Sequence, residues 1–280
     1  MKKALVLFAM VFSASFVFAQ GNISNVLQNG NENTADVTQK GATNISLVVQ
    51  DDSQNDVVVS QEGAGNLSEM QAAGGNNLVN IAQVGDLNNN VTLITEANNT
   101  AASSQSGNGN TNRQELNTVG SSATNIQEGD NNKTIQIQTG TGNNTIFSQT
   151  VGSNNISTQE QNGENSSIFV DQLGDNNATT ITQNGLSNNV AARQEGNNNG
   201  LAVSQNGNNN FAGGENEVLL DQFGNENSAT LVQEGNLNAS GIYQTGNGNE
   251  SINSQTGGSN NSIIEQLGST NKATVTQSDN

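Results

Sequence analysis

Residues 31–41, with the sequence NENTADVTQKG, contain the pattern that decides the fold. Asn33, Val37 and Gln39 stand at alternate positions, and Gly41 follows two positions after the glutamine. Alternation over seven residues is typical of a strand with one buried face. Glycine is typical of a tight turn, because it adopts backbone conformations that other residues avoid. The 11-residue unit Asn-x-small-x-apolar-x-Gln-x-Gly-x-x therefore predicts one strand followed by one turn.

This unit repeats along almost the whole chain. Glutamine recurs at intervals of 11 from Gln28 to Gln277, with one shift of a single residue and one shift of six. Of the 23 positions in this series, 20 are Gln, and the exceptions are Ala72, Ile94 and Leu116. No charged residue falls on an inward position, as the desolvation cost of a buried charge requires. The chain is therefore predicted to form about 23 short strands.

A seven-residue strand and a four-residue turn cannot bury an inner face alone, so two units are expected to face each other as one 22-residue rung. The predicted fold is all-β, a β-solenoid or cross-β stack of eleven and a half rungs, about 55 Å tall at ~4.8 Å per rung. Equivalent amides then lie above one another as ladders. The predicted ladder residues are Asn22, Gln28, Asn33, Gln39, Asn44, Gln50, Asn55, Gln61, Asn177, Gln183, Asn188, Gln194, Asn227, Gln233, Asn238, Gln244, Asn260, Gln266, Asn271 and Gln277. The predicted turn glycines are Gly30, Gly41, Gly63, Gly174, Gly185, Gly196, Gly235, Gly246, Gly257 and Gly268.

The composition excludes several other classes of protein. The 280 residues include 53 Asn and 26 Gln, are 31% hydrophobic and 3% aromatic, and contain no Pro, Cys, His or Trp. A core of bulky apolar side chains is therefore not expected, and neither are disulfides, thiolate zinc sites or Cys- and His-based catalysis. The absence of proline suits backbone that is hydrogen-bonded as strand nearly throughout. We expect no enzyme, no catalytic or metal-binding residues and no cofactor.

The first residues indicate export. Lys2 and Lys3 precede an apolar run over residues 4–18, and Val17 and Ala19 suit a cleavage site before Gln20. Residues 1–19 are thus predicted to be a signal peptide, and no later segment is long and apolar enough to span a membrane. The remaining chain has five basic against 25 acidic residues. Such a surface argues against nucleic acid and anionic lipid as partners.

Residues 22–280 are predicted to form a single repeat domain in three blocks, 22–154, 155–210 and 216–280. The one-residue and six-residue insertions separate the blocks, and the second, at 211–215, is expected to lengthen one turn. Between residues 88 and 161 the position two before the glutamine is polar, with Phe147 as its only apolar occupant. This stretch is predicted to be the weakest part of the stack.

The two ends of the predicted stack, residues 22–28 and 271–277, are strands with no recognisable cap. Uncapped strand edges template the addition of another chain. The expected partner is therefore a second copy, joined head to tail. Because 23 is odd, the first and last strands would lie on the same sheet, and each added copy would turn by about half a revolution.

The repeat resembles the curlin repeat of curli subunits, whose unit is Ser-x5-Gln-x-Gly-x-x-Asn-x-Ala-x3-Gln. The segment over residues 31–50 carries Gln39, Gly41, Asn44 and Gln50 at matching spacings, although Asn usually replaces the first Ser. A second copy of the motif begins at residue 227 and carries glutamine, glycine, asparagine and glutamine at the same spacings. The resemblance implies a secreted subunit of extracellular amyloid fibres that serve cell adhesion and biofilm matrix. It also implies passage through a curli-type outer-membrane channel and nucleation at the cell surface.

Three other interpretations remain open. The chain could be the minor or nucleator subunit of such a fibre, or a soluble β-solenoid that binds ice or carbohydrate along a flat face. A regular outward threonine array would favour ice binding, but the outward positions mix residues such as Leu47, Asp36 and Lys133. The third interpretation is a disordered Asn/Gln-rich tract, against which the strict spacing argues.

Overall fold

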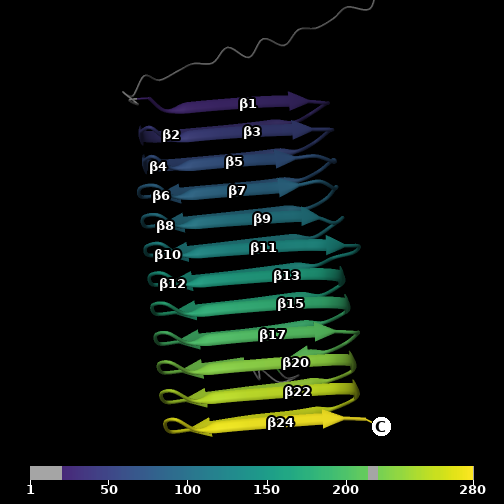
Figure 1. Ribbon diagram of the computed structural model, residues 1–280. Helices are drawn as coiled ribbons and strands as arrows, with labels where there is room; N and C mark the ends of the chain where they lie inside the picture. Colours follow the sequence, from purple (N-terminus) through teal and green to yellow (C-terminus); the bar gives the residue numbers. More distant parts are fainter. Residues whose placement is uncertain (1–20, 214–219, 280) are drawn as a thin grey trace, which may run out of the picture.

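A computed structural model describes residues 21–213 and 220–279. The described residues form two parallel β-sheets that face each other, with the chain alternating between them as it winds down the stack (Figure 1). The predicted signal peptide, residues 1–19, lies outside the described residues. Nowhere in the described part of the chain is there a helix of the length and apolar character needed to cross a membrane.

The first sheet, called sheet A, contains twelve strands in the order of the chain. They are β1 (Ile23–Asn29), β3 (Ile45–Asp51), β5 (Leu67–Ala72), β7 (Asn89–Ile94), β9 (Thr111–Asn117), β11 (Lys133–Gly140), β13 (Ile156–Glu164), β15 (Ala178–Leu186), β17 (Gly200–Asn206), β20 (Ser228–Asn236), β22 (Glu250–Gly258) and β24 (Lys272–Ser278).

The opposite sheet, called sheet B, holds the remaining strands. They are β2 (Thr34–Ala42), β4 (Asp56–Ala64), β6 (Leu78–Val84), β8 (Thr100–Ser106), β10 (Ser122–Glu128), β12 (Thr145–Val151), β14 (Ser167–Leu173), β16 (Asn189–Glu195), β18 (Phe211–Ala212), β19 (Leu220–Phe223), β21 (Ala239–Thr245) and β23 (Asn261–Leu267).

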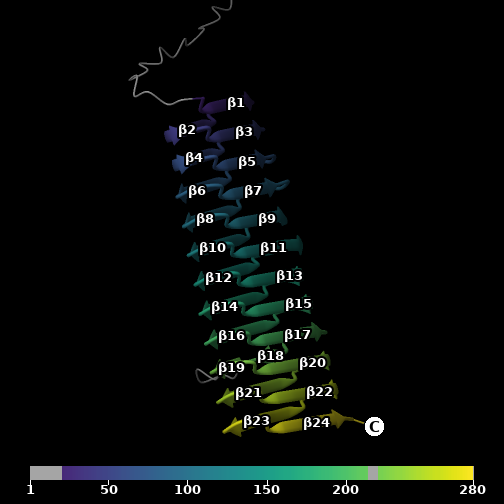
Figure 2. The same cartoon turned by 60° about the vertical axis from the view of Figure 1, so that its left-hand side comes forward.

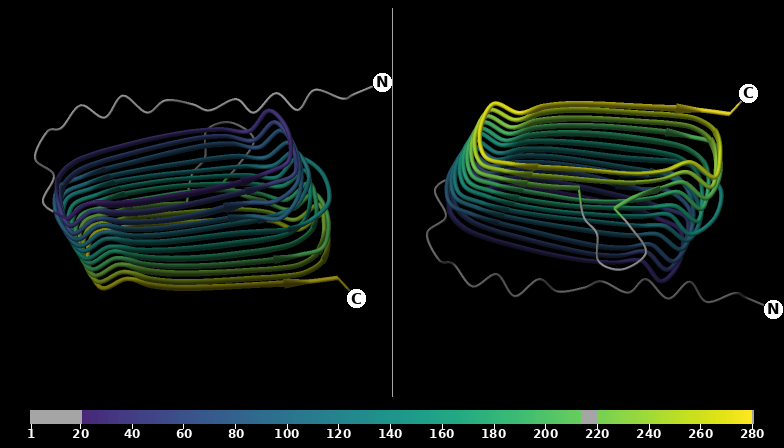
Figure 3. Two further views of the ribbon diagram at one scale, coloured as in Figure 1. Left: turned by 90° about the horizontal axis from the view of Figure 1, so that it is seen from above. Right: turned by 90° about the horizontal axis from the view of Figure 1, so that it is seen from below.

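Strands within each sheet pair in parallel at a nearly constant offset. Ile23 pairs with Ile45 and Ile45 with Leu67, so one rung comprises 22 residues. Figure 2 shows the sheets as two layers, and Figure 3, viewed from above and below, shows successive turns at either side of a flattened coil, each displaced slightly from the one before. The predicted all-β solenoid of two 11-residue units per rung is confirmed.

Side chains alternate between the space between the sheets and the outer faces. In β3 the inward Ser46, Val48 and Gln50 are fully buried, whereas Ile45 and its alternate neighbours are partly or fully exposed. Buried polar residues of the described part of the chain are all Asn, Gln, Ser or Thr. The prediction that charges stay outside is thus confirmed for these residues, since a buried unpaired charge costs far more than a hydrogen-bonded amide.

The predicted register is wrong in β12. We predicted that Phe147 faces inward and that Gln149 belongs to the glutamine series, but Ser148 and Thr150 are the buried residues. The single extra residue lies between Gly140 and the start of β12, not at the predicted boundary between 154 and 155, because Gln127 pairs with Thr150. A slip of one residue turns every side chain of a strand to the other face.

This register is favoured on both faces of sheet B. Ile146 is buried between Ala123 and Ile168 in the rungs above and below. On the outer face, the ring of Phe147 stacks on that of Phe169 with centroids 5.2 Å apart. Burial of one apolar side chain and aromatic stacking of another outweigh the loss of one glutamine from its series.

The six-residue insertion does not lengthen a turn, as predicted for residues 211–215. Phe211 and Ala212 form β18 and pair with Asn189 and Val190 of β16. β19 then resumes the pairing with the same strand at Ala192. The extra residues therefore interrupt one strand at an outward position, and residues 214–219 lie outside the described residues. The 24 elements thus occupy 23 strand positions.

The apolar core consists of two separate clusters. One extends from Val48 to Ala123 and the other from Ile146 to Ile264. Where the two clusters approach each other, the central inward column is polar; from β7 to β13 it contains Thr92, Ser103, Gln114, Asn125, Gln136, Ser148 and Gln159. Both side-chain polar atoms of the buried Asn125 lack a hydrogen-bond partner in the described part of the chain. The central column of these rungs is therefore held by amides and hydroxyls, and their buried apolar side chains, such as Ile94, Leu116 and Ile146, stand at other inward positions.

We predict that backbone amides of β8–β13 exchange with solvent faster than those of β3–β6 and β14–β17. An unpaired buried polar group costs about 1–3 kcal/mol, so local opening of the polar section should require less free energy. A difference of about 1.4 kcal/mol corresponds to tenfold faster exchange. Hydrogen exchange resolved by residue or by peptide measures this, and equal protection of the three sections would contradict it.

Candidate functional site

Glutamine side chains form hydrogen-bonded ladders along both sheets. Within each ladder the Nε2 of one glutamine donates to the Oε1 of its equivalent one rung later, at 2.7–3.1 Å; the bond from Gln61 to Gln83 is an example. The same Nε2 of Gln61 also donates to the carbonyl of Ile45 on the opposite sheet, at 3.0 Å. A ladder glutamine such as Gln61 thus joins successive rungs and also joins sheet A to sheet B.

The structure places all the predicted ladder glutamines in this arrangement. As donor, acceptor or both, the bonds include Gln28, Gln39, Gln50, Gln61, Gln183, Gln194, Gln233, Gln244, Gln266 and Gln277.

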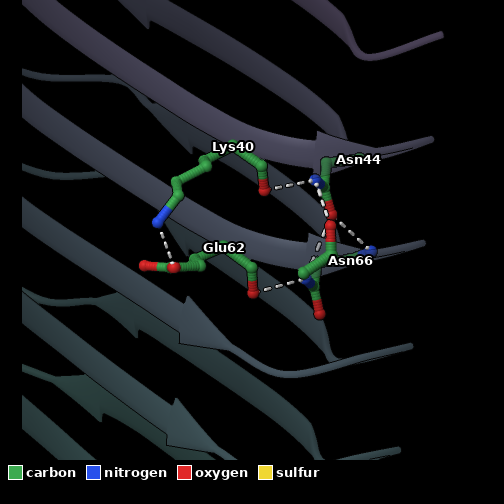
Figure 4. A network of polar contacts seen from close by, with 5 residues as sticks. Lys40, Asn44, Glu62 and Asn66 are labelled. Carbon is green, nitrogen blue, oxygen red and sulfur yellow. Dashed lines mark hydrogen bonds and ion pairs between the residues drawn. The ribbon is translucent and has the colours of Figure 1, made fainter. Parts of the chain in front are cut away.

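The inward asparagines bond differently from the amide-to-amide stacking that we expected. The Oδ1 of Asn44 accepts the backbone N–H of Asn66 at 3.0 Å, and its Nδ2 donates to the carbonyl of Gly63 at 2.9 Å. Direct bonds between the two side-chain amides occur only in some rungs, as between Asn66 and Asn44 (Figure 4). Because asparagine has a shorter side chain than glutamine, its amide reaches the backbone where the turn meets the strand.

All ten predicted asparagines take part in these bonds between rungs. They are Asn22, Asn33, Asn44, Asn55, Asn177, Asn188, Asn227, Asn238, Asn260 and Asn271.

Both glutamine ladders are interrupted once. On sheet A, Ala72, Ile94 and Leu116 replace glutamine in three successive rungs, and on sheet B, Thr150 replaces it in one. The Oε1 atoms of Gln138 and Gln172, directly after the two breaks, are buried without a hydrogen-bond partner. Because the three apolar residues occupy consecutive rungs, their break leaves one glutamine Oε1 without a donor. Three separate breaks would leave several such atoms.

Sequence reasoning missed another ladder, which runs through the turns after sheet B. The Oδ1 of Asp86 accepts the backbone N–H of Ala64, and Asp86 in turn donates its own N–H to the Oδ1 of Asn108. Asn108 continues the series to Asp130. The signal was present in the sequence, because Asp or Asn directly follows the turn glycine in these copies.

The turn glycines are required by close contact between rungs as well as by the turn. All ten predicted glycines have positive φ: Gly30, Gly41, Gly63, Gly174, Gly185, Gly196, Gly235, Gly246, Gly257 and Gly268. A Cβ atom on Gly41 would lie 2.0 Å from the carbonyl oxygen of Gly63 in the next rung. No side chain fits at this position without moving the backbone.

A few charges on the outer faces stand next to a charge of opposite sign. Arg193 lies between Asp171 and Asp221 in successive strands of sheet B, and it also pairs with Glu195 at 2.9 Å. Burial raises the pKa of the Asp171 and Asp221 carboxyls above the usual range, and the Arg193 guanidinium partly opposes this. These residues give the outer face an irregular pattern of charge. A regular array of one residue type, such as the threonine array that would favour ice binding, is not formed by them.

The ladders stop at two open ends. At one end β3 is the one described strand that pairs with β1, and Val26 is 46% exposed although Val48, one rung further on, is 0% exposed. No donor among the described residues reaches the Oε1 of Gln28 or Gln39. At the other end, Gln266 and Gln277 donate only to backbone carbonyls. One end therefore presents acceptors and the other presents donors.

We predict that Gln183→Ala destabilises the stack by about 2–6 kcal/mol. The substitution removes bonds to Gln161 and Gln205 and to the carbonyl of Ser167, so the Nε2 of Gln161 loses its acceptor in the ladder and the buried Oε1 of Gln205 loses its donor. Urea denaturation measures the loss. Thr182→Ala, on the outer face of the same strand, is the control and should change stability by no more than about 1 kcal/mol. Equal losses of stability in the two variants would show that the hydrogen bonds of the ladder do not stabilise the stack.

A second pair of variants tests the glycine column. Gly185→Ala should cost at least about 2 kcal/mol, because the residue has φ +114° and its Cβ would lie 2.1 Å from the carbonyl oxygen of Gly207. Gly200→Ala is the control, since it has open space around its Cβ, and should be neutral or stabilise by up to about 1 kcal/mol. Urea denaturation measures the stability of both variants. An unchanged stability of Gly185→Ala would contradict the close contact between rungs.

Comparison with known proteins agrees with this arrangement. The family model for the curlin associated repeat matches residues 30–63, 224–252 and 254–278. These segments cover strands at both ends of the stack. No curated protein matches the chain in sequence. The chain therefore contains segments that match the curlin associated repeat, on strands built from the same 11-residue unit.

Proposed function

We propose that this chain is a secreted structural subunit that assembles with copies of itself into curli-like amyloid fibres for cell adhesion and biofilm matrix. The observation that carries the proposal is the pair of open ends, where complete rungs are exposed and no strand of the described residues pairs with them. Such edges add further strands unless they are covered or charged. The inward residues of β1 and β24 contain no charge that would oppose addition.

The interior of the stack supports the same function. Parallel in-register strands with amide ladders along the axis have the geometry of cross-β fibres. A copy added at either end continues each ladder, because the donors at one end match the acceptors at the other. The fibre would therefore have the same internal structure within a subunit and between subunits.

The family supports the remaining parts of the proposal. Curlin repeats are associated with extracellular fibres, so an outer-membrane curli-type channel and a nucleator subunit are the proposed partners for export and growth. The predicted signal peptide supports export. We propose a structural role and no catalytic one.

We predict that Val26→Lys prevents assembly while the single chain still folds. Val26 lies at the exposed inner edge of β1, so a lysine there is solvated in the monomer. Addition of another copy would bury the ammonium group without a partner, at a cost of several kcal/mol. The dissociation constant for adding a monomer should rise at least about a hundredfold. Sedimentation and electron microscopy after removal of denaturant measure assembly, and circular dichroism measures folding.

Asn25→Lys is the matched control. It introduces the same charge at the neighbouring outward position of β1, where the ammonium group stays in water after assembly. Fibres with a 4.7–4.8 Å reflection are expected for the parent chain and for this control. If both remain monomeric at high concentration, the proposed function is wrong. If Val26→Lys assembles as the parent does, β1 is not part of the junction.

A further inference from the structure

We propose that successive copies join with a half turn about the fibre axis, so that β23 pairs with β1 of the next copy and β24 with β2. This inference rests on the proposed function. It specifies which strands meet and in what orientation, and the structure contains four separate features that bear on it.

The first feature is the unequal number of strands. Sheet A has twelve strands and sheet B has eleven strand positions, since β18 and β19 share one. The first and last strands, β1 and β24, are both on sheet A, as Figure 2 shows. A copy added without rotation would set β1 against β24 and leave one strand position of sheet B empty between β23 and β2. A half turn fills this position with β1, and every strand then has a neighbour.

The second feature is the match of inward side chains. With the half turn, Ser262 of β23 meets Ser24 of the next copy, and Ala273 of β24 meets Ala35. Without it, Ala273 would meet Ser24. Asparagine and glutamine positions coincide in either orientation, but the small inward residues coincide only with the half turn. The serine column of the first rungs, Ser24 and Ser46, then continues the column of Ser240 and Ser262.

The third feature is the direction of the ladders. In the half-turn arrangement the Nε2 of Gln266 reaches the Oε1 of Gln28 in the next copy, and that of Gln277 reaches Gln39. These are the bonds that each glutamine makes within the chain at 2.7–3.1 Å. The buried Nδ2 of Asn22 has no partner in the part of the chain that the structure describes, and the Oδ1 of Asn260 would take the place that Asn44 has for Asn66. Two like ends present only donors or only acceptors, so head-to-head joining makes none of these bonds.

The fourth feature is the position of exposed apolar side chains. Ile263 and Leu267 of β23 are 66% and 67% exposed, and Ile23 and Leu27 of β1 are 49% and 61% exposed. They lie on opposite sheets at opposite ends of the chain. The half turn makes β23 and β1 adjacent strands of one sheet, so these four side chains share one outer face as diagonal neighbours, with Ile23 directly opposite Asn261 and Leu27 opposite Glu265. Without rotation, Ile23 would instead lie beside Lys272.

Two double cysteine variants distinguish the orientations. Ile23→Cys with Asn261→Cys places the thiols on directly paired residues across the half-turn junction. Ile23→Cys with Lys272→Cys does so only for a junction without rotation. Paired residues in neighbouring strands are about 4.8 Å apart, within the Cα distances of disulfides. The chain has no cysteine of its own, and within one copy the two positions are at opposite ends.

Each variant is assembled under reduction, oxidised as a fibre and dissolved in denaturant for non-reducing electrophoresis. The expected result is a ladder of covalent multimers for the 23/261 pair and monomers for the 23/272 pair. The reverse result, or no cross-link in fibres of either variant, overturns the half-turn junction and leaves the proposed fibre intact. Failure of the parent chain to form fibres counts against the proposed function.

The symmetry of unmodified fibres gives a test that needs no substitution. Electron cryo-microscopy should find a rotation near 180° and a rise of about 55 Å per subunit, from eleven and a half rungs of ~4.8 Å. Deleting residues 22–32 removes β1 and its turn and leaves an even number of strands. Fibres of this variant should show a rotation near zero. A rotation near zero for the parent chain overturns the proposal.

Discussion

Every part of this structure depends on the need of a buried amide for a hydrogen-bond partner. The amide of an inward glutamine is buried away from water. The nearest equivalent side chain, which can both donate and accept a hydrogen bond, is the glutamine one rung away. A bond such as that from Gln183 to Gln205 is satisfied only when the two strands are in register. The amides contribute modest net free energy, about 0.5–1.5 kcal/mol for each bond, but a shift of register leaves many of them unpaired at once. The ladders therefore select one register among the many that an Asn- and Gln-rich chain offers.

The backbone obeys the same requirement where the chain turns. Asn44 and its equivalents satisfy backbone groups at the junction of turn and strand, and Asp86 and Asn108 satisfy those of the turn itself. Successive turns can then approach until the carbonyl of Gly63 occupies the space where a side chain of residue 41 would be. Glutamine joins the rungs at the last inward position of each strand, and the shorter amides join them where the turn meets the next strand.

The period of 11 was sufficient to predict the strands, the rungs and the exclusion of charge from the interior. It was not sufficient where the spacing changes. In β12 the sequence contains glutamine at 149 and threonine at 150, and the glutamine pattern favoured the wrong face; the burial of Ile146 decided the register. At β18, an asparagine stands six residues before Gln222, which is the spacing of the repeat. This spacing suggested that a complete 11-residue unit begins after the insertion. Pairing with β16 instead begins at Phe211, since Asn210 already continues the column of Asn188. In both places contacts between rungs override the spacing within one repeat, and such contacts are not visible in a single unit.

The divided strand shows how a stack of this kind can acquire new sequence. β18 and β19 keep their partners on both sides, and the ladder from Gln194 through Gln222 to Gln244 passes the interruption without a break. The break falls at an outward position, so residues added there leave the interior unchanged. Evolution, or a protein engineer, can therefore place a peptide at this point and have it displayed at regular intervals along a filament. With a half turn between copies, the displayed segments would alternate between opposite sides of the fibre.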